Sequence, residues 1–166
     1  IINSMKKGFR KVNYKLYPNA AQINALESLC VHHHQLYNWA LSDRINTYRT
    51  FSYSLSYNDQ SSINTLWRKT RKTHGIFNAN AQSEQVTLKR VDLAFKHFFR
   101  RLANGEKRAG FPRFKPYTRF TGWGYASHGD GWRLFLNKKK HGAIRLTNVG
   151  MIKIRGQARN KDGLPK

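Results

Sequence analysis

The stretch Phe9-Arg-Lys-Val-Asn-Tyr-Lys-Leu-Tyr17 runs directly into Pro18-Asn19-Ala-Ala-Gln22. In its first part apolar residues alternate with Lys and Asn, and this period of two predicts a half-buried β-strand. Pro18 ends the strand because proline lacks a backbone donor. Asn19, with Gln22 three residues later, is typical of a capping box. A strand that passes at once into a helix is therefore expected at the start of the fold.

A long helix is expected after the cap, because apolar residues recur at steps of three and four over roughly eight turns. The stripe comprises Ile23, Leu26, Cys30, His33, Tyr37, Ala40 or Leu41, Ile45 and Tyr48. His33 lies on this stripe and is expected to be a hydrogen-bonded core histidine. His32 and His34 are expected to face solvent or nucleic acid.

Two further helices are predicted. Residues 50–62 have no apolar period and are typical of a loop, with a short helix over 61–72. A second long helix is predicted over 80–104, and Gly105 stands where a C-terminal cap belongs. Residues 18–105 thus form a helical unit.

From Gly110 onward, short alternating runs broken by glycine predict strands at 111–114, 120–125, 132–136, 143–146 and 151–155. The fold class is α+β: a small antiparallel β-barrel with a helical insertion after its first strand. The expected divisions are 5–17 for the first strand, 18–108 for the insertion, 109–158 for the remaining strands and 159–166 for the start of a linker.

The charge balance indicates a polyanionic partner. The chain has 31 Lys and Arg against 8 Asp and Glu, a formal net charge of +23. Such a surface repels itself and gains affinity for phosphate through counterion release, so nucleic acid is the expected partner. No stretch approaches the length of a membrane span, so no membrane partner is expected. Cys30 is the lone cysteine, which favours a reducing cytoplasm.

Catalytic, metal-binding and cofactor-binding residues are not expected in this chain. Two-metal phosphodiester chemistry needs clustered carboxylates, and those here are scattered. Glu84 and Asp92 lie eight residues apart on one helix and are expected to temper local repulsion. The run His32-His33-His34 beside Cys30 lacks the spacing of a zinc site.

Basic residues with aromatic neighbours are the positive signal. Arg68, Lys69, Arg71 and Lys72 fall within roughly one and a half helical turns without Glu at i±4, which favours contact with a phosphate ridge. In Gly110-Phe-Pro-Arg-Phe-Lys115, Phe111 and Phe114 are expected to lock a turn while Arg113 and Lys115 project outward. A purely structural turn is an equal alternative for this segment. With Arg100 and Arg101, these cations are expected to form a continuous track.

Five short motifs occur in order: Tyr14-Lys-Leu-Tyr-Pro-Asn19 with Gln22, Tyr37-Asn-Trp-Ala-Leu41, Leu88 with Ala94-Phe-Lys-His-Phe-Phe99, Gly110–Lys115, and Leu146 with Gly150-Met-Ile-Lys-Ile-Arg155. In these motifs the chain resembles the N-terminal portion of TnpB (OrfB) proteins. These are accessory transposases of bacterial insertion sequences that act as RNA-guided DNA endonucleases. One departure is Val31-His-His-His34, where the family commonly has Gly-x-x-Arg.

The resemblance implies a wedge barrel with helical recognition insertion, followed by a RuvC-like nuclease whose Mg²⁺ and structural Zn²⁺ would lie beyond Lys166. Whether the chain belongs to an active enzyme is left undecided. The implied partners are guide RNA and double-stranded DNA with a short target-adjacent motif, in the bacterial cytoplasm near the nucleoid. By position, Tyr57, Gln85 and Thr121 would present polar groups to that duplex. The candidate nucleic-acid-binding residues are Lys11, Lys15, Tyr57, Arg68, Lys69, Arg71, Lys72, Gln85, Lys89, Arg100, Arg101, Arg113, Lys115 and Thr121.

Two alternatives stay open. A nuclease-dead, RNA-guided transcriptional regulator of the same family would share this part of the sequence. An unguided helix-turn-helix DNA-binding transposase domain would use residues 19–48 to read DNA, but the continuous apolar stripe leaves no short turn near the middle of that segment.

Overall fold

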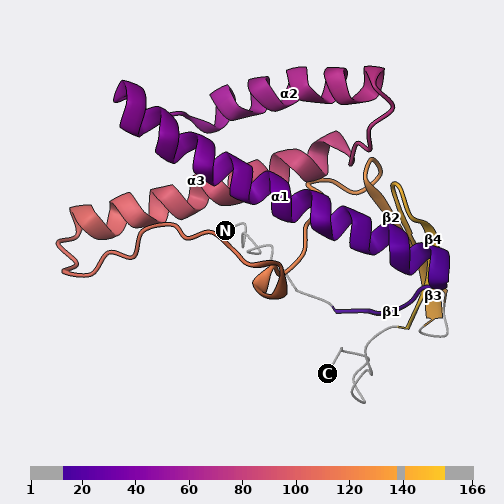
Figure 1. The fold of residues 1–166 in the computed structure, drawn as a ribbon. Helices are drawn as coiled ribbons and strands as arrows, with labels where there is room; N and C mark the ends of the chain where they lie inside the picture. The colour runs from indigo at the N-terminus through magenta and orange to yellow at the C-terminus, as the bar shows by residue number, and fades with distance from the viewer. Residues whose placement is uncertain (1–12, 138–140, 156–166) are drawn as a thin grey trace, which may run out of the picture.

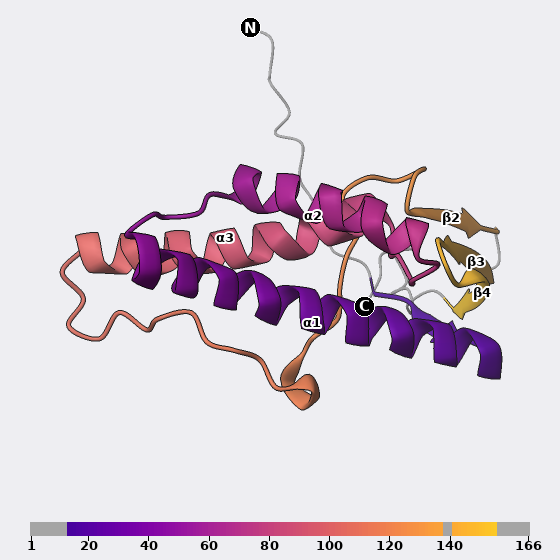
Figure 2. The same ribbon diagram turned by 45° about the horizontal axis from the view of Figure 1, so that its top comes forward.

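The structure, a computed structural model, describes residues 13–137 and 141–155. Three helices lie together, and a small sheet stands at one end beside the first turns of the first helix (Figures 1 and 2). The elements are β1 (Lys15–Tyr17), α1 (Ala20–Phe51), α2 (Tyr57–Thr73), α3 (Ala81–Ala103), a 3-10 turn (Tyr117–Arg119), β2 (Trp132–Leu136), β3 (His141–Leu146) and β4 (Gly150–Arg155). The expected α+β class is confirmed.

The junction between β1 and α1 forms as the capping box predicts. The Asn19 side chain accepts a hydrogen bond from the Gln22 amide at 2.9 Å, and the Gln22 side chain accepts from the Asn19 amide at 3.1 Å. The side-chain Nε2 of Gln22 also donates to the Met151 carbonyl of β4 at 2.7 Å. One side chain therefore starts the helix and ties it to the sheet.

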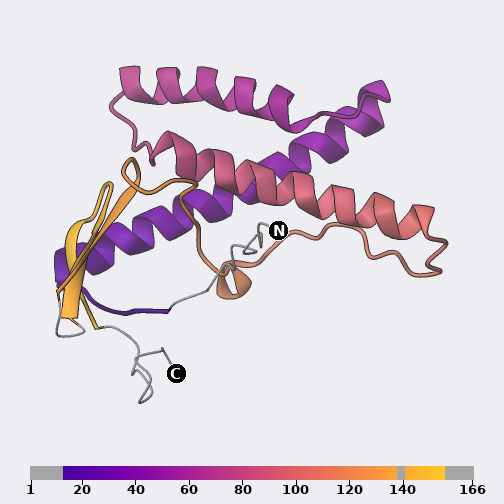
Figure 3. The same cartoon turned by 180° about the vertical axis from the view of Figure 1, so that it is seen from behind.

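The helices alternate in direction along the chain (Figure 3). The loop between α1 and α2 is shorter than residues 50–62, because Ser56 and Asp59 form a second capping box that starts α2 at Tyr57. Asn80 caps the start of α3 with its side chain. Gly105 follows the helix end with φ +73°, a backbone conformation that favours glycine.

The main core lies where α1 and α3 meet. Its fully buried members include Ala40, Leu41, Leu88 and Val91, and Phe120 joins them from the loop after α3. The apolar stripe of α1 is buried only along its middle, since Ile23 is 43% and Tyr48 61% exposed. A helix of 32 residues is about 48 Å long, so its ends extend beyond the helix that covers it.

The sheet is antiparallel with the strand order β1-β4-β3-β2. The first strand thus pairs with the last one, which confirms that the helices are inserted between strands of one sheet. The expected barrel is not closed: among residues 13–137 and 141–155, no further strand pairs with β1 or β2. Residues 5–12 of the predicted first strand lie outside the described residues.

Residues 111–114 and 120–125, predicted as strands, are irregular. Pro112 and Pro116 remove ladder donors, and the Lys115 amide and carbonyl bind the Asn38 side chain instead of a neighbouring strand. Trp123 stacks on His33 with ring centroids 5.7 Å apart. The segment therefore packs across the helices, and it crosses beneath α3 before it reaches β2 (Figure 1).

The prediction that Phe111 and Phe114 both lock the 110–115 segment is half wrong. The Phe111 ring packs edge-on against Phe95 and Phe98, with centroids 5.7 Å and 5.1 Å away. Phe114 is 54% exposed and belongs to no core cluster of the described residues.

We expect Leu88→Ala to lower the free energy of unfolding by about 2–5 kcal/mol, because it opens a cavity between α1 and α3. Phe114→Ala, the control, is expected to change it by less than about 0.5 kcal/mol. Urea unfolding followed by circular dichroism measures both. Equal losses would mean that Phe114 is part of the core.

Candidate nucleic-acid interface

A buried carboxylate lies at the meeting point of the three helices. Glu84 of α3 is fully buried. Its Oε1 lies 2.7 Å from His32 Nε2 and 3.2 Å from Arg71 Nη2. Its Oε2 lies 2.7 Å from Asn64 Nδ2 and 2.9 Å from Arg68 Nη1. The cluster joins one side chain of α1 and three of α2 to α3.

This cluster divides the four cations predicted on α2. Arg68 and Arg71 are three residues apart, so they share a helix face, and that face turns toward Glu84. Lys69 and Lys72 share the next face and are exposed. The absence of Glu at i±4 predicts contact with a phosphate ridge, but the compensating acid, Glu84, belongs to the next helix. Two of the four cations therefore remain free for nucleic acid.

The surroundings of the three histidines agree with the prediction for His33 but not for His32 and His34. His33 is buried as expected, with its ring nitrogens 3.1 Å from Ser83 Oγ and 2.9 Å from Thr87 Oγ1. His32 does not face solvent, because it binds Glu84. His34 binds the Lys115 carbonyl at 2.7 Å. The histidine run thus contacts other protein segments.

The environment shifts the pKa values of two of these groups. Burial, with a smaller effect of neighbouring His32, lowers the pKa of His33 to about 3. Burial by itself would raise the pKa of Glu84, but hydrogen bonds from His32, Asn64 and Arg68 outweigh it and lower the pKa to about 2. At neutral pH His33 is therefore uncharged and Glu84 is ionised.

Two of the sequence motifs meet at Asn38. The Lys115 amide donates to Asn38 Oδ1, and Asn38 Nδ2 donates to the Lys115 carbonyl, both at 2.9 Å. Lys115 Nζ lies 4.7 Å from the centre of the Tyr37 ring. The sequence predicts that Lys115 projects outward, and this prediction is wrong because its side chain is half-buried against α1. Arg113, two residues earlier, is exposed.

Arg90 is a cation that the sequence analysis does not single out. It donates to the Gly122 carbonyl and, at 3.0 Å, to Thr121 Oγ1. Its guanidinium also lies 5.6 Å from the centre of the Phe120 ring. Arg90 thus positions Thr121, one of the predicted duplex contacts. Nothing in the sequence distinguishes it from solvated Lys89.

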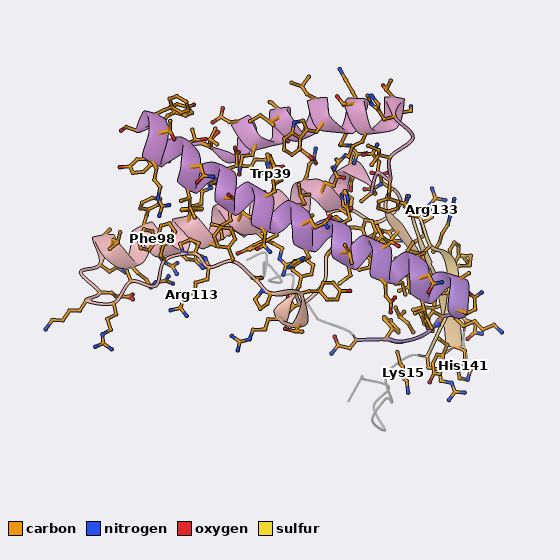
Figure 4. The ribbon with its side chains drawn as sticks, in the orientation of Figure 1. Lys15, Trp39, Phe98, Arg113, Arg133 and His141 are labelled. Atoms are coloured by element: carbon orange, nitrogen blue, oxygen red, sulfur yellow. The ribbon has the colours of Figure 1, made fainter. Side chains whose placement is uncertain are left out.

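An aromatic cleft of about 540 Å³ lies between the end of α1 and the C-terminal half of α3. Arg101, two residues after Phe99 on α3, donates to the carbonyl of Gly110, the residue before Phe111, at 2.6 Å. Figure 4 shows Phe98 and Arg113 in this part of the molecule. The cleft is lined by Arg44, Ile45, Tyr48, Arg49, Ser54, Phe95, Phe98, Phe99 and Phe111.

The predicted contact residues are distributed over the two ends of the molecule. The C-terminal end of α3, with Arg100 and Arg101, lies opposite the sheet that carries Lys15 (Figures 1 and 3). Gln85 and Lys89 are exposed on α3. Tyr57 is half-buried against the core, and Lys11 lies outside the described residues.

Neither a metal-binding cluster nor a membrane-spanning helix is found among the described residues. Within 13–137 and 141–155, no three His, Cys, Asp or Glu side chains gather so as to hold a metal ion. No described helix has the length and apolarity to cross a membrane.

Glu84→Gln is expected to lower the free energy of unfolding by about 3–5 kcal/mol at pH 7, because two arginines then lose their buried counter-charge. Glu106→Gln is the matched control: this carboxylate is half-exposed and lies 3.9 Å from Arg101. The control should stay within about 0.5 kcal/mol of the parent protein. Chemical denaturation compares the two, and similar values would contradict a structural role for the Glu84 cluster.

The stability of the fold should fall as the pH is lowered. The pKa of His33 is about 3 in the folded protein, and its ordinary value is 6.5. Between these two pH values His33 is protonated in the unfolded chain but not in the folded one, so lowering the pH favours unfolding. The lowered pKa of Glu84 adds a loss between pH 4.5 and about 2. We expect up to about 1.4 kcal/mol per pH unit from His33. Unfolding between pH 6.5 and 5 tests this: His33→Gln should flatten the curve, whereas exposed His74→Gln should not.

Comparison with known proteins finds one similarity, in the N-terminal part of the chain. Residues 5–51 match the family model of the OrfB_IS605 helix-turn-helix domain. In the described part of that range the structure has β1 and the unbroken helix α1. No curated protein matches the chain. The family description indicates DNA binding in a transposase-related protein. Residues 5–51 are therefore similar to the N-terminal helix-turn-helix domain of OrfB insertion-sequence proteins.

Proposed function

We propose that this chain is the nucleic-acid-binding part of a transposon-encoded, RNA-guided DNA endonuclease, which binds guide RNA and target-adjacent duplex DNA. The observation that supports this most is the segregation of charge. Of only 8 acidic residues, Glu84 and Asp92 are buried and paired with cations. The remaining surface is therefore left with a large excess of positive charge.

The excess positive charge suits a partner that is recognised through its phosphates. Lys69 and Lys72 on α2, Lys89 on α3 and Arg113 in the following loop are all exposed. Exposed Lys and Arg side chains can contact phosphates, and contacts to phosphates carry no sequence information directly. In an RNA-guided system base pairing supplies sequence recognition, so a protein rich in backbone contacts is what the mechanism requires.

The helical arrangement favours guided over unguided binding. Residues 20–51 form one helix without an internal turn, so 19–48 does not contain the two helices of a helix-turn-helix. α2 follows after a short connection, but its inner face is occupied by Glu84. The family's Mg²⁺ and structural Zn²⁺ belong, in this proposal, to its nuclease part.

Affinity for RNA transcribed from the end of the insertion sequence should fall steeply with salt, by about 10³-fold between 50 and 200 mM if six phosphates are contacted. Filter binding measures it. A flat salt dependence would contradict the proposal. Duplex binding that is equally tight with and without this RNA would favour the unguided alternative.

Arg113→Ala should weaken this RNA or DNA binding uniformly across sequences and reduce the salt slope by about one, with unchanged folding stability. Phe114→Ala is the control, because the neighbouring ring is exposed and carries no charge. Unchanged affinity and slope in Arg113→Ala would remove this segment from the interface.

A further inference from the structure

The sheet has one covered face and one open face. Residues directly opposite on neighbouring strands share a face. On the inner face Leu146, Ile152 and Ile154 are buried. On the outer face the register places Lys15 opposite Arg155, and Arg133 opposite Arg145. The open face therefore carries the charged members of all four strands.

The cations of this face lack compensating charge. None of the four strands contains Asp or Glu. Among the described residues, Lys15, Arg133, Arg145, Lys153 and Arg155 form no ion pair. Like charges directly opposite each other destabilise a sheet. An anion bound across the face would relieve this repulsion.

Aromatic rings stand at both edges of the same face. The cross-strand row reads Tyr17, Lys153, Ala143 and Phe135. The two rings belong to strands three spacings apart, about 14 Å. Phe135 is 47% exposed and packs against no other ring of the described residues. Ala143 lies between them in this row, and its small side chain leaves space above the sheet.

Tyr17 combines a ring with cations. Arg155 Cζ and Lys15 Nζ lie 5.0 Å and 5.5 Å from its ring centre. A guanidinium plane beside an aromatic ring offers stacking surface and positive charge to a nucleotide. Figure 4 shows Lys15 and His141 near one end of the strands and Arg133 near the other, so the cations extend over the length of the sheet.

We propose that this outer sheet face binds single-stranded nucleic acid, with unpaired bases stacked on Phe135 and Tyr17 and phosphates bound by the surrounding cations. The inference rests on the proposed function and names the class of nucleic acid that the sheet binds. A duplex fits less well, because its bases are already stacked on each other and cannot cover Phe135. Stacking on aromatic side chains combined with a basic surface is the usual means of binding single strands.

The test uses fluorescent oligonucleotides of about 12 residues, within the range of known single-strand sites. Oligouridine, oligothymidine and a mixed-sequence duplex of equal length are titrated with the full chain. Phe135→Leu keeps the apolar bulk but removes the ring, and should weaken single-strand binding by roughly 5- to 150-fold. Phe135→Tyr should retain it. Phe51→Leu, on a 75% exposed ring at the end of α1, is the matched control.

The position of the bound strand is measured separately by ultraviolet crosslinking of the unmodified protein. We expect crosslinks to peptides that contain Tyr17 or Phe135, and competition by oligouridine but not by the duplex. Preferred oligouridine would identify RNA as the source of the strand, and preferred oligothymidine would identify DNA. Unchanged affinity in Phe135→Leu, or crosslinks only at other segments, would overturn the inference. If structured RNA from the element end still binds with a steep salt slope, the proposed function survives that result.

Discussion

The buried carboxylate of Glu84 is the interaction on which the helical part depends. It accepts from His32 of α1 and from Asn64, Arg68 and Arg71 of α2 while belonging to α3. Removing a charge from water is costly, so the carboxylate is stable inside only because these donors surround it. Since each donor comes from a fixed position on its helix, the cluster also fixes how the helices are oriented. The apolar contacts at Leu41, Leu88 and Val91 supply burial but less directional information.

The inward placement of acids shapes the surface as well as the core. A chain of net charge +23 that buries Glu84 and Asp92 and pairs them with cations has few carboxylates left outside. The repulsion between exposed cations then persists in the folded state, where it opposes compactness and favours association with polyanions. Stability and nucleic-acid binding are thus consequences of one distribution of charge. The sheet shows the same effect locally, since Arg133 and Arg145 are neighbours across two strands.

Much of the fold could be predicted from local sequence. The capping box at Asn19, the cap at Asn80 and the glycine at 105 set helix ends through contacts of a few residues. The alternating runs at 132–136 and 143–146 became paired strands for the same reason. Residues 111–114 and 120–125 alternate between apolar and polar residues as strands do. Their backbone and rings nevertheless contact α1 and α3 rather than a neighbouring strand. Apolar-polar alternation alone does not tell which surface a segment will cover, so the sequence could not show that these two runs lie outside the sheet.

The sequence by itself determined the charge, the helical periods, the caps and the classification of the N-terminal region. These are properties of composition and of neighbours within about one helical turn. Only the tertiary structure decided which cations are free. Arg68 and Lys69 are adjacent in the chain, but one pairs with an acid 16 residues away while the other is exposed. Lys115 is bound to Asn38, and Arg90 holds Thr121, across 77 and 31 residues. Such contacts depend on how helices and loops pack, because the partner of a long side chain is set by distance in space rather than by spacing in the chain.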